Sequence, residues 1–210
     1  MAEYIKKNVQ LQILVFFLSM PLIIWAVGNF PQRTMLKESL SVVTITAFSL
    51  VIGLFYLTRA NRRVLQNVPF GKVVKLHKLV GYIAVPILLL HPLFLVVPRF
   101  YEAGLTPGEA FQTIITTFSN SGVVFGLTSW SLLLLLGVTS LLRQKIPLQY
   151  QTWRVIHYIL AMLCIFSALF HVIDLGRHLD LIMTGFVVLL ATGGIYQSTK
   201  KVFSRRNIGE

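Results

Sequence analysis

The sequence has little charge and long stretches with none. Only 12% of its 210 residues are charged, whereas 55% are hydrophobic, and its mean hydropathy is +0.74. A soluble domain of this size carries about 25% charged residues. Apolar runs of about 20 residues, long enough to cross a hydrocarbon core of about 30 Å, recur along the chain. The composition therefore excludes an ordinary soluble domain and predicts an integral membrane protein.

Cysteine is almost absent: Cys164 is the single one, in the middle of an apolar run. It cannot form an intrachain disulfide, and no CxxC pair is present for zinc, an iron–sulfur cluster or covalently attached haem. We interpret Cys164 as a small buried apolar residue. The GxGxxG and GxxxxGK[ST] motifs are also absent, and only eleven residues follow Thr199. We therefore expect no flavin or NADPH domain in this chain.

Six apolar segments predict an all-α bundle of six transmembrane helices. None shows the alternation of a β-barrel strand, and a helix satisfies its own backbone groups in lipid. The first segment is too long for a signal peptide and no cleavage site follows it. We expect residues 1–210 to form a single transmembrane domain. The segments are Leu11–Val27, Leu40–Leu57, Val74–Val97, Gly122–Leu142, Trp153–Val172 and Leu179–Thr199.

Lysine and arginine gather on alternate sides of these segments. Fifteen of the 19 lie in the N-terminus, residues 58–78, residues 143–154 and the C-terminus. The other four are Arg33, Lys37, Arg99 and Arg177. The positive-inside rule then places both termini in the cytoplasm. The net charge of +12 suits an anionic inner leaflet, so we expect the lipid bilayer of a bacterial cytoplasmic (inner) membrane, and no nucleic acid, as its partner.

Two of the segments carry a pair of histidines at the same interval. His77 and His91 are fourteen residues apart in the third segment, as are His157 and His171 in the fifth. Fourteen residues make about four helical turns in a left-handed bundle, so both rings of a pair leave the same helix face, about 21 Å apart. Ionisable residues inside a membrane need partners that lipid does not supply, so these four histidines predict a function.

Both segments run from the cytoplasm outward, so we expect His77 at the depth of His157, and His91 at the depth of His171. Two facing imidazoles suit the iron of a haem b, whereas zinc takes about four ligands. A proton relay would use carboxylates, and none lies in the interior of the six segments. The pattern therefore predicts two bis-histidine haems b, an inner one on His77 and His157 and an outer one on His91 and His171.

Four neighbouring residues are candidate haem contacts. Gly81 and Ala161, one turn beyond the inner histidines, would let a flat macrocycle approach both helices, although small residues also serve ordinary helix packing. Arg154, three residues before His157, is placed to meet haem propionates at the cytoplasmic edge. Arg99 could do the same outside, and either arginine could instead mark the headgroup boundary.

Other residues receive a structural interpretation. Pro86 and Pro92 are expected to kink the third helix. His178, beside Arg177 in a short outer loop, has no partner at the fourteen-residue interval and is expected to be a solvated surface residue.

The longest outer loop, residues 98–121, contains the motif of a short surface helix. Thr106 is a candidate N-cap, Pro107 suits the first helical position, and Glu109 follows three residues after the cap. The helix would lie on the outer face and either cover a site or fill a gap. Its expected apolar side consists of Phe111, Ile114, Ile115 and Phe118.

At the two histidine segments the sequence resembles the ferric reductase-like transmembrane domain family. This family includes the membrane halves of NADPH oxidases and ferric reductases, and the haem subunit of the methionine sulfoxide reductase system. The stretches "KLHKLVGYIAVPILLLHP" and "WRVIHYILAMLCIFSALFHVIDL" are similar to its two ligand helices, including the tryptophan and arginine before His157. The resemblance extends from about Leu40 to Thr199.

The resemblance implies a di-haem cytochrome that relays electrons from the inner haem to the outer haem and then to an extracytoplasmic acceptor. Many relatives continue into a flavin and NADPH domain that this chain lacks. The donor would then be a separate protein, a free flavin or a quinone, and any reductase activity would require that donor. Ferric chelates, oxygen and a periplasmic enzyme all stay open as acceptors.

Two other interpretations remain. The cytochrome b of quinol-oxidising complexes pairs histidines at nearly this interval, but on its second and fourth spans, and no PEWY-like quinol-site motif occurs here. A membrane scaffold or transporter with structural histidines is the third possibility.

Overall fold

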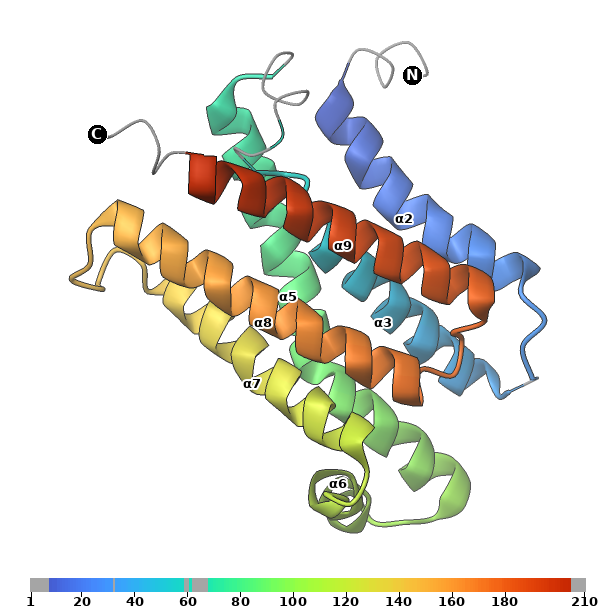
Figure 1. Ribbon diagram of the computed structural model, residues 1–210. Helices are drawn as coiled ribbons and strands as arrows, with labels where there is room; N and C mark the ends of the chain where they lie inside the picture. Colours follow the sequence, from blue (N-terminus) through green and yellow to red (C-terminus); the bar gives the residue numbers. More distant parts are fainter. Residues whose placement is uncertain (1–7, 32, 59–60, 62–67, 205–210) are drawn as a thin grey trace. The chain divides into compact units, whose positions relative to one another are not determined.

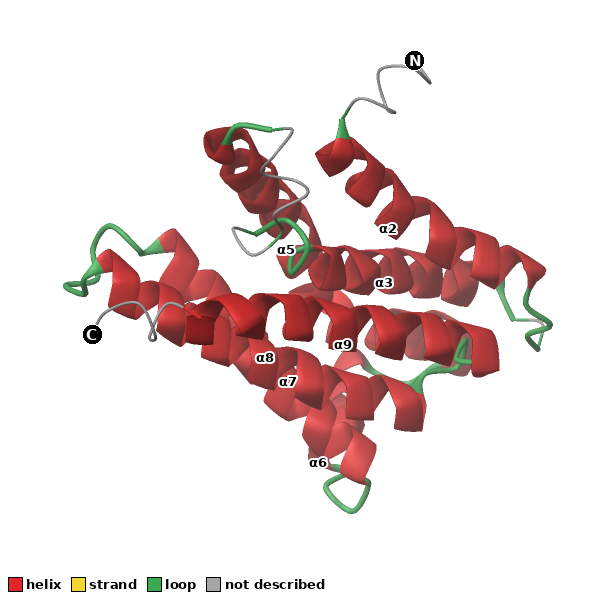
Figure 2. Cartoon of the chain, turned by 45° about the horizontal axis from the view of Figure 1, so that its top comes forward, coloured by secondary structure: helices red, strands yellow, loops and turns green. Residues whose placement is uncertain are grey.

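The computed structural model describes residues 8–31, 33–58, 61 and 68–204. Within these ranges the chain is helical and contains no strand (Figure 1, Figure 2). Six of the helices are long and apolar enough to cross a membrane, so the chain is a multi-pass integral membrane protein, as predicted. The helices are α2 (Val9–Val27), α3 (Met35–Gly53), α5 (Phe70–Ala103), α6 (Pro107–Thr116), α7 (Ser121–Leu141), α8 (Tyr150–Leu175) and α9 (Leu181–Ser204).

The predicted starts differ most for α3 and α5, which begin at Met35 and Phe70. α3 starts at Met35 rather than Leu40, so the charged residues Lys37 and Glu38, which the prediction left outside the span, lie in its first turns. An acidic side chain is favourable there, since the N-terminus of a helix carries a partial positive charge. α5 exceeds the predicted Val74–Val97 at both ends. Its 34 residues amount to about 51 Å of helix, more than a hydrocarbon core of about 30 Å requires.

The second span also ends earlier than predicted, at Gly53 instead of Leu57, and residues 54–58 form turns. The Tyr56 hydroxyl donates a hydrogen bond to the Leu190 carbonyl of α9 at 2.8 Å. A Cβ atom on Gly194 would lie only 2.8 Å from the Phe55 Cβ, so the absence of a side chain there lets the turn approach α9 closely. This turn is important for the site because it also fixes the carbonyl of Leu57.

The described chain forms two compact units, with a boundary inside α5 at Pro86. The first unit contains α2, the part of α3 from Ser41, α5 up to Pro86, and α9. Within it, the Ser49 hydroxyl donates to the Phe17 carbonyl at 2.8 Å. The rings of Phe16 and Phe186 are 6.0 Å apart, which joins α2 to α9. The predicted kinks at the α5 prolines stay predictions.

The second unit contains residues 33–40, α5 from Ile87, and helices α6, α7 and α8. α7 and α8 lie side by side (Figure 1). They run antiparallel, because Gly122, Ser129 and Ser140 contact His171, Cys164 and His157 in turn. Cys164 is buried, as predicted. The α7–α8 pair therefore spans both predicted levels of histidine ligands.

Candidate functional site

His91 of α5 and His171 of α8 face each other in the second unit. The centres of their imidazole rings are 6.4 Å apart, and the ring planes are inclined by 72°. Imidazole nitrogens bind a metal ion at about 2 Å, and the ring centre lies about 1 Å behind the nitrogen, so two rings that share one ion have centres about 6 Å apart. The observed separation therefore suits two ligands on one iron.

The ring of His171 is held by α7. Its Nδ1 atom is 2.8 Å from the Gly122 carbonyl oxygen, and because a carbonyl only accepts, Nδ1 carries the proton and donates. This leaves Nε2 as the nitrogen that can bind a metal. A Cβ atom on Gly126 would lie 2.5 Å from the same Nδ1, so Gly126 is needed for the ring to pack against α7.

His77, on the part of α5 in the first unit, has an equivalent arrangement. Its Nδ1 atom lies 3.1 Å from the carbonyl oxygen of Leu57, in the turn that follows α3. The proton is again on Nδ1, and Nε2 is again the nitrogen that can bind a metal. The early end of α3 thus has a consequence for the site, since a helix that continued to Leu57 would direct this carbonyl along its own axis.

His157 of α8 is in the second unit and is held by two side chains. Its Nδ1 atom is 3.4 Å from the Ser140 hydroxyl of α7, a long contact. Its ring stacks on that of Trp153, with centres 5.0 Å apart and planes inclined by 28°.

These arrangements fit bis-histidine haem ligation. Among the residues that the structure describes, no group of three or more His, Cys, Asp or Glu side chains is placed to hold a metal ion alone. A metal on the His91–His171 pair would therefore take its other ligands from a prosthetic group, and a porphyrin supplies four nitrogens. The backbone contacts of His77 and His171 are those that orient metal-binding imidazoles. Haem binding itself stays a prediction.

The four predicted neighbours lie on the ligand helices without a contact that defines a role. Gly81 is half-buried on α5, and no atom of its own unit would lie within 4 Å of an added Cβ. Ala161 and Arg154 are half-buried on α8, and Arg99 is half-buried near the end of α5. Their assignment to the macrocycle and its propionates stays a prediction.

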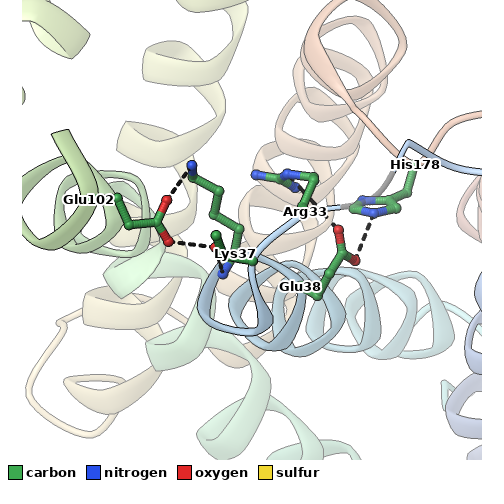
Figure 3. Close-up of polar contacts among 6 residues, drawn as sticks. Arg33, Lys37, Glu38, Glu102 and His178 are labelled. Atoms are coloured by element: carbon green, nitrogen blue, oxygen red, sulfur yellow. Dashed lines mark hydrogen bonds and ion pairs between the residues drawn. The ribbon is translucent and has the colours of Figure 1, made fainter.

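The prediction for His178 was wrong. Its side chain is 4% exposed, and Nε2 lies 3.1 Å from a carboxylate oxygen of Glu38 (Figure 3). Arg33 lies 4.0 Å from the other oxygen of the same carboxylate. Figure 3 also shows Lys37 paired with Glu102. Glu38 and His178 are 140 residues apart, so no local pattern indicated a partner that removes the imidazole from solvent.

The predicted helix of the outer loop is present as α6, and it begins with the predicted cap at Thr106. The Thr106 hydroxyl accepts from the Glu109 amide at 3.3 Å, and the Thr106 amide donates to the Glu109 carboxylate at 3.0 Å. The Thr106 hydroxyl also donates to the Glu109 carboxylate at 2.6 Å, and this hydrogen bond, together with that from the Thr106 amide, holds the pKa of Glu109 below its usual value. The expected apolar side was partly wrong, because the helix ends at Thr116 and Phe118 is 64% exposed beyond it. The side chain of Ile115 lies outside the described part of the structure.

Sequence reasoning missed the residues of α7 that support the ligands. The Gly122 carbonyl accepts a hydrogen bond from His171, and the missing side chain of Gly126 leaves room for the same ring. Neither contact, nor that of Ser140 with His157, can be recognised before α7 is placed beside α8. Arg143 received no role at the site, and Trp153 was noted only as part of the family resemblance, although both stand close to His157 in the stretch "LLRQKIPLQYQTWRVIH".

Three comparisons with known proteins bear on this site. The family model described as "Ferric reductase like transmembrane component" matches residues 43–168, a range that includes His77, His91 and His157 and ends three residues before His171. An uncharacterized protein of Archaeoglobus fulgidus is 42% identical over 152 residues, which cover 72% of this chain and 82% of that relative. No solved structure matches the chain.

Proposed function

Because the chain belongs to the ferric reductase-like transmembrane family, we propose that it is a di-haem b-type membrane cytochrome. The family implies a redox role in a membrane. In this proposal the protein relays electrons across the cytoplasmic membrane, from a cytoplasmic or membrane donor to an extracytoplasmic acceptor.

The arrangement of His91 and His171 supports the proposal most strongly. The two residues are 80 positions apart in the sequence, yet their ring centres are 6.4 Å apart, the separation suited to one shared iron. The Gly122 carbonyl also fixes the His171 tautomer that leaves Nε2 available. A helix-to-helix hydrogen bond between two histidines would not require a third helix to orient one ring in this way.

The residues of the chain have three tasks in this function. His77, His91, His157 and His171 would hold the haem irons, and the carbonyls of Leu57 and Gly122 orient two of these rings. Hydrogen bonds to the ligands and the apolar surroundings adjust the reduction potential. Haem b, when bound, supplies reversible one-electron chemistry at its iron.

The electrons would enter at the level of His77 and His157 and leave at the level of His91 and His171. The donor in this proposal is a separate flavoprotein, a free flavin or a quinone. The acceptor is a ferric chelate, oxygen or a periplasmic enzyme. Outward transfer of electrons from the cytoplasm moves charge across the bilayer, so its rate would depend on the membrane potential.

A spectroscopic experiment tests the proposal. The protein, expressed with ample haem and purified in detergent, should give a haemochrome spectrum equivalent to two b-type haems per chain. His91→Ala should retain one haem that dithionite reduces, and in liposomes it should no longer pass electrons to an external ferric chelate. His178→Gln is the matched control, because it replaces the remaining histidine and should keep both haems. A colourless wild-type protein would contradict the proposal.

A further inference from the structure

The connection between α7 and α8, together with the first turn of α8, forms a corner on the predicted cytoplasmic side. Its residue Arg143 has no acidic partner among the described residues. The two terminal nitrogens of Arg143 donate to the carbonyls of Ile146 and Leu148, at 3.4 and 3.1 Å. The guanidinium carbon lies 5.3 Å from the centre of the Trp153 ring. The Nε atom of Arg143 is buried, and no acceptor reaches it from the described residues.

Trp153 has a second buried donor in the same corner. Its ring stacks between those of Tyr150, at 6.1 Å, and His157, at 5.0 Å. Its indole Nε1 is buried and likewise has no acceptor among the described residues. By contrast, the indole of Trp130 donates to the Leu89 carbonyl at 2.9 Å.

Two unsatisfied donors in one corner are energetically costly. Each buried N–H group without an acceptor costs about 1–3 kcal/mol. No Asp or Glu occurs between Glu109 and Asp174 in the sequence. Arg143, Lys145 and Arg154 lie in that interval, and none of them forms an ion pair within the described part of the chain. A bound anion would satisfy both donors and balance this charge.

We propose that Arg143 Nε and Trp153 Nε1 form a binding site for an oxyanion, a carboxylate or a phosphate, beside His157. Two molecules carry this chemistry at a cytoplasmic membrane face: a haem through its propionates and an anionic lipid through its phosphate. The first source rests on the proposed function, whereas the second does not. The stacking of Trp153 on His157 places the site next to a predicted iron ligand.

The main variant is Trp153→Phe, which removes the N–H donor and retains a ring for stacking on His157. Arg143→Lys is the second variant, because it keeps the charge and loses Nε. Trp130→Phe is the matched control, since it makes the same change where the indole donor is satisfied inside the protein. Lys145→Gln controls for the loss of an exposed positive charge in the same loop.

Two measurements distinguish the sources. The first is the rate at which apomyoglobin removes haem from each purified protein, together with the midpoint potentials of the haems. The second is the increase in Tm when phosphatidylglycerol is added to delipidated protein. If propionates occupy the site, Trp153→Phe and Arg143→Lys should accelerate the release of one haem about tenfold. They should also lower its midpoint potential, because an uncompensated propionate stabilises ferric iron. Neither control should do so.

If lipid phosphate occupies the site, haem release should be unchanged in both variants. The increase in Tm with phosphatidylglycerol should then be lost in Trp153→Phe and Arg143→Lys and retained in Trp130→Phe and Lys145→Gln. If both variants match wild type in both measurements, the oxyanion site does not exist. A wild-type protein without haem would refute the proposed function alone, and the lipid measurement would still decide this inference.

Discussion

The two ends of the second unit differ in the partners of their charged side chains. At the predicted outer end, Arg33 and His178 share the carboxylate of Glu38, and Lys37 pairs with Glu102. At the predicted cytoplasmic end, Arg143 contacts only backbone carbonyls and aromatic rings among the described residues. The outer end therefore pairs several of its charges within the chain, whereas Arg143 at the inner end has no acidic partner among the described residues.

The ligands show the same difference between the ends. His171 donates to a backbone carbonyl at 2.8 Å, and Gly126 allows α7 to pack against its ring. His157 contacts a hydroxyl at 3.4 Å and stacks on Trp153, whose own N–H group is unsatisfied. On α8, the outer candidate ligand His171 is thus oriented by a backbone carbonyl, whereas His157 contacts a hydroxyl and an indole.

The largest expected effect comes from filling the space beside His171. Gly126→Val should displace the imidazole, because even its Cβ would lie 2.5 Å from Nδ1. We expect the haemochrome assay to show one haem per chain instead of two, with the inner haem retained. Gly185→Val on α9 is the control, since an added Cβ there meets no atom within 4 Å. Two haems in Gly126→Val would show that the outer site is not rigid.

The second prediction tests whether the outer end depends on its internal partners. His178→Ala removes a buried imidazole that contacts the Glu38 carboxylate at 3.1 Å. A hydrogen bond to a charged group contributes about 1.5–3 kcal/mol, so we expect a loss of about 2 kcal/mol in the free energy of unfolding. Chemical denaturation in detergent measures it. Arg177→Ala, an exposed neighbour, is the control and should change stability by less than about 0.5 kcal/mol.

The sequence predicted the class of fold because membrane helices are defined by local composition. All six spans were found, but α3 and α5 were placed with wrong ends. Charged residues near the start of α3 were interpreted as loop, although Glu38 has partners elsewhere in the fold. The long α5 extends past the apolar run that identified it. Hydropathy thus locates the hydrocarbon crossing, and tertiary contacts decide where each helix begins and ends.

The candidate ligands were predictable for a similar reason, because the interval of fourteen residues is a property of one helix at a time. The supporting groups were not. The Gly122 carbonyl has no sequence signature, and the partner of His178 is 140 residues away. The unsatisfied indole of Trp153 is recognisable only once the neighbouring atoms are known. Local patterns therefore indicated the candidate ligands, and the fold was needed to show what orients their rings.

A smaller effect is expected from Ser140→Ala, which removes the hydroxyl beside His157 Nδ1. An acceptor on Nδ1–H makes an imidazole more electron-rich and so favours ferric iron. Its removal should raise the midpoint potential of the inner haem slightly, by the equivalent of less than about 1 kcal/mol for so long a contact. This change is opposite in sign to the one expected for Trp153→Phe. Redox titration measures it, with Ser131→Ala as an exposed control on α7.

The smallest effect concerns α6, which lies outside the membrane-spanning segments. Hydrogen bonds from Thr106 lower the pKa of Glu109 in the folded protein. A lowered folded pKa means that this stabilisation is fully present above the unfolded value of about 4.3 and is lost as the pH falls through the folded value. Hydrogen exchange of the amides of residues 107–116, corrected for intrinsic rates, should therefore be faster at about pH 3 than at about pH 6. In Glu109→Gln this dependence on pH should disappear. Equal behaviour of the two proteins would mean that α6 is ordered by its contacts with α7 and not by its cap.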